Sequence, residues 1–184
     1  MMIIEEGSSR RLTHGESEMA KSVFKNAIDY RRVRVHHGGY LPFGLQNKDT
    51  AMTPNGEMYY PTSLYQDDYS KRKSKDQWLF IHEMAHVWQH QMGMNVRTRG
   101  LISWAVEYKY SLPPYYTLAD FAMEQQASII ADYYILINFG LEKWNDDKLF
   151  TGLIGPDLVN KYQNVLINFL NDPTDRSALW NLKK

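Results

Sequence analysis

The stretch Phe80-Ile81-His82-Glu83-Met84-Ala85-His86 carries two histidines four residues apart, with a glutamate directly after the first. On a helix, side chains four residues apart lie on one face, so both imidazoles can reach a single metal ion. The carboxylate of Glu83 then projects beside that ion, where it can accept a proton from water. The spacing therefore predicts His82 and His86 as metal ligands and Glu83 as a catalytic base.

The flanking residues predict that this pattern lies on a helix. Ser74-Lys75-Asp76-Gln77 fits a capping box with Ser74 as the N-cap, and Gly93 fits the position just after the helix. Apolar residues between them recur at helical spacing and predict a core-facing stripe: Trp78, Ile81, Ala85, Trp88 and Met92. An HExxH pattern on such a helix is typical of zinc metallopeptidases. The alternative is a pair of ordinary histidines on an amphipathic helix.

The composition excludes several classes of function. The chain has 184 residues, enough for one domain, and 43% of them are hydrophobic, enough for a core. Its 21 basic and 21 acidic residues cancel, which argues against a nucleic-acid partner, and no apolar run is long enough for membrane insertion. There is no cysteine, so disulfides, thiol catalysis and thiolate-bound zinc are excluded.

The order of expected elements predicts an α+β fold. Residues 1–11 are expected to be a loose leader, and residues 12–184 a single domain; the stretch 1–6 is too short and too acidic for a signal peptide. A capping box at 13–16 predicts a helix over 14–28, and 33–35 alternates like a strand. Asn55-Gly56, between 51–52 and 58–60, predicts a hairpin. Further helices are expected over 100–110, over 118–139 with Thr117 as cap and Gly140 as end, and over 157–170. The fold should be mostly helical, with a small antiparallel sheet beside the HExxH helix.

Zinc needs a third protein ligand if a fourth position is to stay open for water. Position 92 is Met92 and position 89 is Gln89, so the metzincin arrangement is excluded. His90 is one turn further on the same helix, where it would wrap one ion poorly. Glu124 is the single glutamate of the helix expected at 118–139, and it shares a face with apolar and small residues. A carboxylate there is costly to bury without a partner such as a metal ion, so Glu124 is the predicted third ligand, with a solvent-exposed Glu124 as the alternative.

Other residues are candidates for supporting roles. Asp132, and after it Asp120, could accept the second N–H of a ligand imidazole. The candidates for stabilising an oxyanion are Tyr133, Tyr134, Tyr115, Tyr116 and His90. The expected strand Met58-Tyr59-Tyr60 is a candidate sheet edge for docking an extended peptide substrate.

Two stretches together resemble a known family. They are Phe80–Gln91, with the sequence FIHEMAHVWQHQ, and Glu124-Gln125-Gln126-Ala127 with Ile130-Ala131-Asp132-Tyr133-Tyr134. The upstream segments 33–36 and 51–56 agree, so the likeness covers about residues 12 to 140. The chain resembles the Vgr-related and Rhs-associated zinc metallopeptidase domains of bacterial type VI secretion systems, which are similar in turn to wider gluzincin families.

This resemblance implies a zincin-like fold, Zn²⁺ on His82, His86 and Glu124, and Glu83 as catalytic base. It also implies an antibacterial effector or toxin domain, made in the bacterial cytoplasm without a cleaved signal and delivered to the periplasm of a target cell. A secretion-apparatus carrier and an immunity protein are the implied partners, beside a peptide or protein substrate. Two other functions stay open: hydrolysis of a peptidoglycan peptide or amide bond, and an inactive zincin-like module that only binds a partner.

Overall fold

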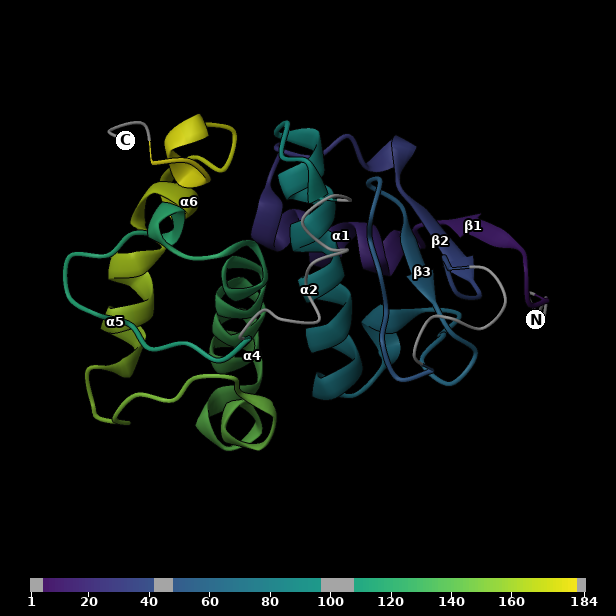
Figure 1. Ribbon diagram of the computed structural model, residues 1–184. Helices are drawn as coiled ribbons and strands as arrows, with labels where there is room; N and C mark the ends of the chain where they lie inside the picture. Colours follow the sequence, from purple (N-terminus) through teal and green to yellow (C-terminus); the bar gives the residue numbers. More distant parts are fainter. Residues whose placement is uncertain (1–4, 42–47, 97–107, 182–184) are drawn as a thin grey trace.

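The computed structural model describes residues 5–41, 48–96 and 108–181, and it places one helix at the centre of the molecule (Figure 1). This helix, α2 (Ser74–Gln91), lies between a small sheet on one side and helix α4 (Met123–Asp147) on the other. α1 (His14–Phe24) also packs on α2. The α+β fold, rich in helix with a small sheet, is confirmed. The HExxH residues lie on α2, which contacts α1, α4 and the sheet strand β3 (Met58–Tyr60).

The sheet is mixed rather than antiparallel, so that expectation was wrong. Its order is β1-β2-β3, formed by Ser9–Arg11, Arg34–His37 and Met58–Tyr60. β1 runs antiparallel to β2, whereas β2 and β3 are parallel. Residues 38–57 separate β2 from β3, which is longer than the dozen or so residues that a parallel crossover requires. The predicted hairpin is present as an antiparallel bridge between Met52 and Tyr59, on the other side of β3, and Gly56 in its turn has φ +81°.

The segment expected as a loose leader contributes β1. Arg10 in this strand donates two hydrogen bonds of 2.7 Å to the carboxylate of Glu16, which is fully buried at the start of α1. The capping box between Thr13 and Glu16 is present as predicted. α1 ends at Phe24, earlier than expected, because Lys25 takes φ +50° and turns the chain away.

α2 begins at Ser74, one residue earlier than the predicted N-cap implied, and its cap differs from the prediction. The N-cap is Lys73, without a side-chain cap, and the amide of Gln77 donates instead to the carbonyls of Ser70 and Arg72. The core stripe is confirmed, with Ile81, Ala85 and Trp88 fully buried, and Trp78 and Met92 partly buried at its ends. Gly93 follows the helix with φ +97°, as its position predicted.

The second half of the chain is helical, with boundaries that differ from the prediction. Thr117 caps a short 3-10 helix, Leu118–Asp120, and α4 starts after Ala122. Gly140 has φ +84° and kinks α4, which then continues to Asp147 instead of ending. Two helices, α5 (Leu158–Val165) and α6 (Ile167–Asn171), replace the single one expected, and a 3-10 turn, Arg176–Ala178, follows. Of the helix expected over 100–110, residues 100–107 lie outside the described part, and Tyr110 forms a parallel bridge with Phe150.

α2 and α4 pack side by side, and this contact builds the site (Figure 1). Three small residues of α4, Ala127, Ser128 and Ala131, are fully buried there and allow the two helices to approach closely. Within the described residues, none of the helices is both long and apolar enough to cross a membrane.

Candidate metal centre

His82 and His86 lie on the face of α2 that meets α4, as their four-residue spacing predicted. Both are buried, with exposed fractions of 5% and 4%. Their rings are nearly perpendicular, with centroids 4.9 Å apart, and their Nε2 atoms are 3.2 Å from each other. The two nitrogens therefore converge on one point, as ligands of a single ion do.

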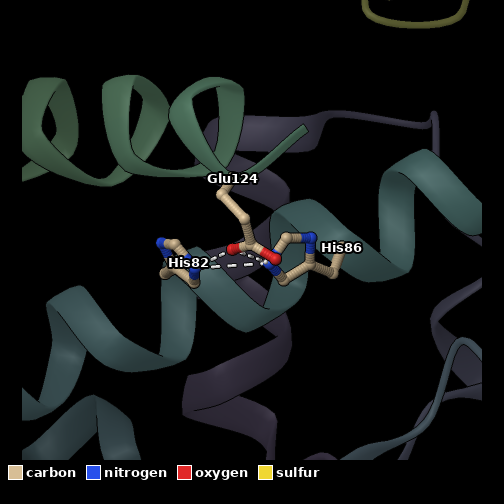
Figure 2. Close-up of side chains that lie close together, drawn as sticks. All are labelled: His82, His86 and Glu124. Carbon is tan, nitrogen blue, oxygen red and sulfur yellow. Dashed lines mark hydrogen bonds and ion pairs between the residues drawn. The ribbon is translucent and has the colours of Figure 1, made fainter. Parts of the chain in front are cut away.

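Glu124 extends from the first turn of α4 to the same point (Figure 2). Its Oε2 atom lies 3.3 Å from Nε2 of His82 and 3.0 Å from Nε2 of His86. The residue is buried, and its main-chain carbonyl accepts a hydrogen bond from the Ser128 hydroxyl. Within the described residues, His82, His86 and Glu124 form the group of side chains able to hold a metal ion.

The distances between these three atoms fit a small tetrahedral ion. Ligand atoms about 2.0 Å from a tetrahedral centre lie about 3.3 Å from one another. The observed separations of 3.0, 3.2 and 3.3 Å match three corners of such a cage. Nitrogen from two imidazoles and oxygen from one carboxylate is also a donor set that divalent transition metals accept. The residues present therefore fit a metal ion with one open position.

The pKa values of His86 and Glu124 indicate that the imidazoles and the carboxylate attract each other in this buried site. Burial alone would lower the pKa of His86, but the Glu124 carboxylate outweighs it and raises the pKa to about 9. Burial likewise opposes ionisation of Glu124, yet the imidazoles of His86 and His82 hold its pKa well below the usual range. A negative carboxylate facing two imidazoles is thus the stable state without metal, and a cation can replace the proton of His86.

Glu83 is buried beside this group, at 4% exposure, and its carboxylate has a partner that the sequence did not reveal. The hydroxyl of Thr53 donates a hydrogen bond of 2.6 Å to Oε2 of Glu83. Thr53 is itself buried and lies in the turn between Met52 and Tyr59. The hairpin therefore positions the candidate base.

Asp132 lies near the site, but it does not bond to a ligand imidazole. Its Oδ1 accepts the indole N–H of Trp78 at 2.7 Å, and its Oδ2 accepts from the Tyr110 hydroxyl and from the main-chain N–H of Leu149. Burial raises the pKa of Asp132 to about 6, against the effect of these donors. The ring of Trp78 stacks on His82 at 5.0 Å, so an indole stands where a carboxylate was expected.

The remaining supporting candidates are exposed or bond to partners other than His82, His86 and Glu124. Asp120 is exposed, and its carboxylate accepts hydrogen bonds from the main-chain N–H and the hydroxyl of Thr117. The hydroxyl of Tyr133 accepts from Gln163, and that of Tyr134 donates to Gln77. Tyr115 and Tyr116 are exposed.

His90 is exposed on the last turn of α2, outside the ligand group. Its ring faces Gly56 in the hairpin turn, where an added Cβ would come within 2.5 Å of the His90 Cδ2 atom. With Arg32, Asn55, Glu57 and Gln91, these two residues line an open polar cavity of about 350 Å³. The structure therefore places His90 against the hairpin, not on the metal.

The expected substrate strand is β3, but its outer edge is covered. Met58 and Tyr60 are fully buried. The N–H and carbonyl of Tyr59 both bond to Met52, at 2.8 and 3.1 Å. The segment Met58-Tyr59-Tyr60 therefore does not present a free edge at Tyr59 in this conformation.

Three residues near the ligands were not singled out from the sequence: Gln89, Trp78 and Thr53. Gln89 contacts His86, and its HExxHxxQ spacing, one turn beyond the second histidine, was the signal that could have found it. Trp78 stands one turn before His82 and was assigned to the core. Thr53 carried no signal, because only the tertiary fold brings the hairpin turn to α2.

Comparison with known proteins places this geometry in a family. No family model matches the sequence. The type VI secretion system spike protein VgrG2b of Pseudomonas aeruginosa is 42% identical over 135 residues, which are 70% of this chain and 13% of the spike protein. This chain thus spans a small part of that relative's length.

A solved structure gives a match over nearly the whole of both chains. The effector domain of Pseudomonas aeruginosa VgrG2b aligns with a TM-score of 0.63 and 36% identity, covering 80% of this chain and 87% of that one. Identity at this level over this share of both chains reflects common descent as well as a common fold. The chain belongs to the family of the VgrG2b effector domain.

Proposed function

We propose that this chain is a zinc metallopeptidase of zincin-like fold that hydrolyses peptide bonds. The observation that carries the proposal is the cage of His82, His86 and Glu124, with Glu83 next to it on the same helix. Three protein ligands and one open position distinguish a catalytic zinc site from a structural one, which has four protein ligands.

Zinc is the metal that this site fits best. The ligands are two imidazole nitrogens and one carboxylate oxygen, at separations suited to a tetrahedral ion. Magnesium and calcium prefer six or more oxygen ligands, which this group does not offer. When bound, zinc supplies a Lewis acid that polarises a carbonyl oxygen and lowers the pKa of water toward neutrality.

Glu83 acts as the proton carrier in this mechanism. Its carboxylate takes a proton from the attacking water and later delivers it to the leaving amine. The Thr53 hydroxyl occupies Oε2, so Oε1 is the oxygen left to receive the proton. The same hydrogen bond fixes the rotation of the carboxylate.

The setting we propose is that of an effector delivered by a type VI secretion system. Support comes from the relatives, a spike protein of such a system and its effector domain. In this proposal a spike-type carrier takes the domain from the producing cytoplasm to the periplasm of a target cell, and an immunity protein protects the producer. The substrate is then a peptide or protein of the target cell.

The proposal is tested with purified protein in three forms: wild type, Glu83→Gln and His82→Ala. We expect about one zinc per chain in wild type and in Glu83→Gln, and almost none in His82→Ala. Cleavage of a peptide library, followed by mass spectrometry, should occur with wild type alone. A wild-type protein that binds zinc and cleaves purified peptidoglycan fragments but no peptide would move the substrate to the cell wall. A wild-type protein that takes up no zinc would leave only a binding module.

A further inference from the structure

Gln89 is fully buried on α2, one turn after His86, and its side-chain amide has three hydrogen-bond partners. Oε1 lies 2.8 Å from Nδ1 of His86. Nε2 lies 2.9 Å from the carbonyl oxygen of Met123 and 2.9 Å from Oε1 of Gln126. Because Met123 directly precedes Glu124, one side chain contacts a ligand on α2 and the backbone beside the ligand on α4.

The partners of Gln89 determine which way its amide points. A main-chain carbonyl only accepts hydrogen bonds, so the atom of Gln89 that faces Met123 must be the nitrogen. Its oxygen must then face His86, and because that oxygen only accepts, Nδ1 of His86 must donate. A neutral imidazole carries one proton, so a proton on Nδ1 leaves the lone pair on Nε2, the nitrogen that faces Glu124.

The hydrogen bonds of Gln126 require the same orientation of the Gln89 amide. Its Nε2 donates to the main-chain carbonyls of Leu118 and Phe121, at 3.1 Å each, and to that of Leu179 at 3.4 Å. Its Oε1 is therefore free to accept from Gln89. These hydrogen bonds form a chain from the main-chain carbonyls through the amides of Gln126 and Gln89 to the ring of His86. At each contact only one assignment of donor and acceptor is possible.

We infer that Gln89 is a positioning residue that sets the tautomer of His86 and ties its ring to the α4 turn bearing Glu124. The consequence is a metal cage that is assembled before the ion arrives, so less ordering is required on binding. This inference rests on the proposed metal site and adds the residue that organises it. It also explains why an amide occupies this position: an apolar side chain would remove three hydrogen bonds in a buried site.

Gln77 provides a matched control on the same helix. It is also buried, and its amide also has three partners: the carbonyls of Ser70 and Arg72 and the hydroxyl of Tyr134. None of these is a metal ligand. Gln77→Met and Gln89→Met therefore remove the same number of hydrogen bonds with the same change of shape, but only Gln89→Met releases His86.

The experiment measures the zinc affinity of wild type and both variants by competition with a chromophoric chelator, alongside their melting temperatures. We expect both variants to melt at lower temperature, and Gln89→Met alone to bind zinc about 10- to 100-fold more weakly, the usual effect of losing such a partner. Equal zinc affinities in the two variants would overturn the inference while leaving the metal site intact. Absence of zinc binding by wild type would instead remove the proposed function, and this inference with it.

A second measurement needs no variant and applies even if Gln89→Met does not fold. Nitrogen-15 spectra of the histidine rings in the zinc-loaded protein should show His86 protonated at Nδ1, with a proton that exchanges slowly with solvent. An Nδ1 proton that exchanges as fast as that of the exposed His90, or a proton on Nε2, would contradict the assignment.

Discussion

The indole nitrogen of Trp78 donates a hydrogen bond of 2.7 Å to Oδ1 of Asp132, so this carboxylate oxygen is occupied by the indole and not by a histidine. The Trp78 ring itself stacks on His82. Nδ1 of His82 has no hydrogen-bond partner among the described residues. The two candidate ligand histidines are thus held differently: His86 contacts Gln89 through a hydrogen bond, and His82 stacks on the Trp78 ring.

The pH dependence of stability should report the buried state of Asp132. Its pKa is raised from 3.8 to about 6, so the folded state favours the protonated carboxyl. That contribution is fully present below about pH 4 and is lost as the pH rises through 6, a change of about 3 kcal/mol. Comparing urea unfolding of wild type and Asp132→Asn from pH 4 to 7.5 isolates it, because the other groups titrate in both proteins. A difference between the two that does not vary with pH would contradict this prediction.

Zinc binding should release a proton from His86. Its pKa of about 9 in the metal-free protein means that the ring is protonated at neutral pH. The apparent affinity should therefore rise about tenfold per pH unit from 7 to 9 and level off above that, if one proton is displaced. Calorimetry in buffers of different ionisation enthalpy counts the proton directly. A pH-independent affinity below pH 9 would show that His86 is already neutral.

The stability of the metal-free protein should also change with pH, between about pH 6.5 and 9. The pKa of His86 is raised from 6.5, so its pairing with Glu124 stabilises the fold fully below about pH 6.5 and is lost as the pH rises through 9. The lowered pKa of Glu124 expresses the same interaction, so it is counted once. This single interaction predicts a loss of about 3 kcal/mol in the free energy of unfolding, measured by urea unfolding in the presence of a chelator.

Glu124→Gln should abolish metal binding, because a neutral amide replaces the anionic ligand. We expect zinc content near zero after dialysis, measured by atomic emission. Glu142→Gln is the control on the same helix, where the carboxylate is 88% exposed and belongs to no ligand group in the described residues. Full zinc content in Glu124→Gln would exclude Glu124 as a ligand.

Thr53→Val should reduce peptidase activity without reducing zinc content. It removes the 2.6 Å hydrogen bond to Glu83 and leaves the shape of the side chain nearly unchanged. We expect kcat to fall about tenfold or more, within the range that a positioned base contributes, with little change in KM. Thr53→Ser keeps the hydroxyl and should restore most of the activity. If valine and serine behave alike, Thr53 has no part in positioning the base.

Arg10→Met should destabilise the fold, because it leaves the Glu16 carboxylate buried without its cation. Breaking such a pair costs about 3–5 kcal/mol. Lys21→Met is the control on α1, since its pair with Glu18 is exposed and screened by water. The free energy of unfolding of both variants is measured by chemical denaturation and compared with that of wild type. Similar losses in the two would mean that β1 is not anchored through Arg10.

The parts of the structure that the sequence predicted are those with a local signal. Two histidines at a helical spacing, the capping box at Thr13 and the glycine after α2 each depend on residues a few positions apart. Glu124 was found although 38 residues separate it from His86, because a single carboxylate on an apolar face needs a partner.

What the sequence did not predict depends on long-range packing. The parallel pairing of β2 and β3 follows from the path of the chain over residues 38–57, which carries no periodic pattern. Asp132 was predicted to accept from a ligand imidazole, but it accepts from the indole of Trp78, whose ring stacks on His82. Thr53 reaches Glu83 only because the hairpin lies along α2.

The turn that carries Thr53 packs closely against α2 at Gly56. Gly56 has a backbone conformation that disfavours other residues, and its α-carbon lies so close to the imidazole of His90 that one added methyl group would collide with it. A methyl group there would require either the exposed ring of His90 or the turn itself to move. Because Thr53 lies in this turn and holds the carboxylate of Glu83, the orientation of the candidate base is linked to the packing of the turn against the last turn of α2.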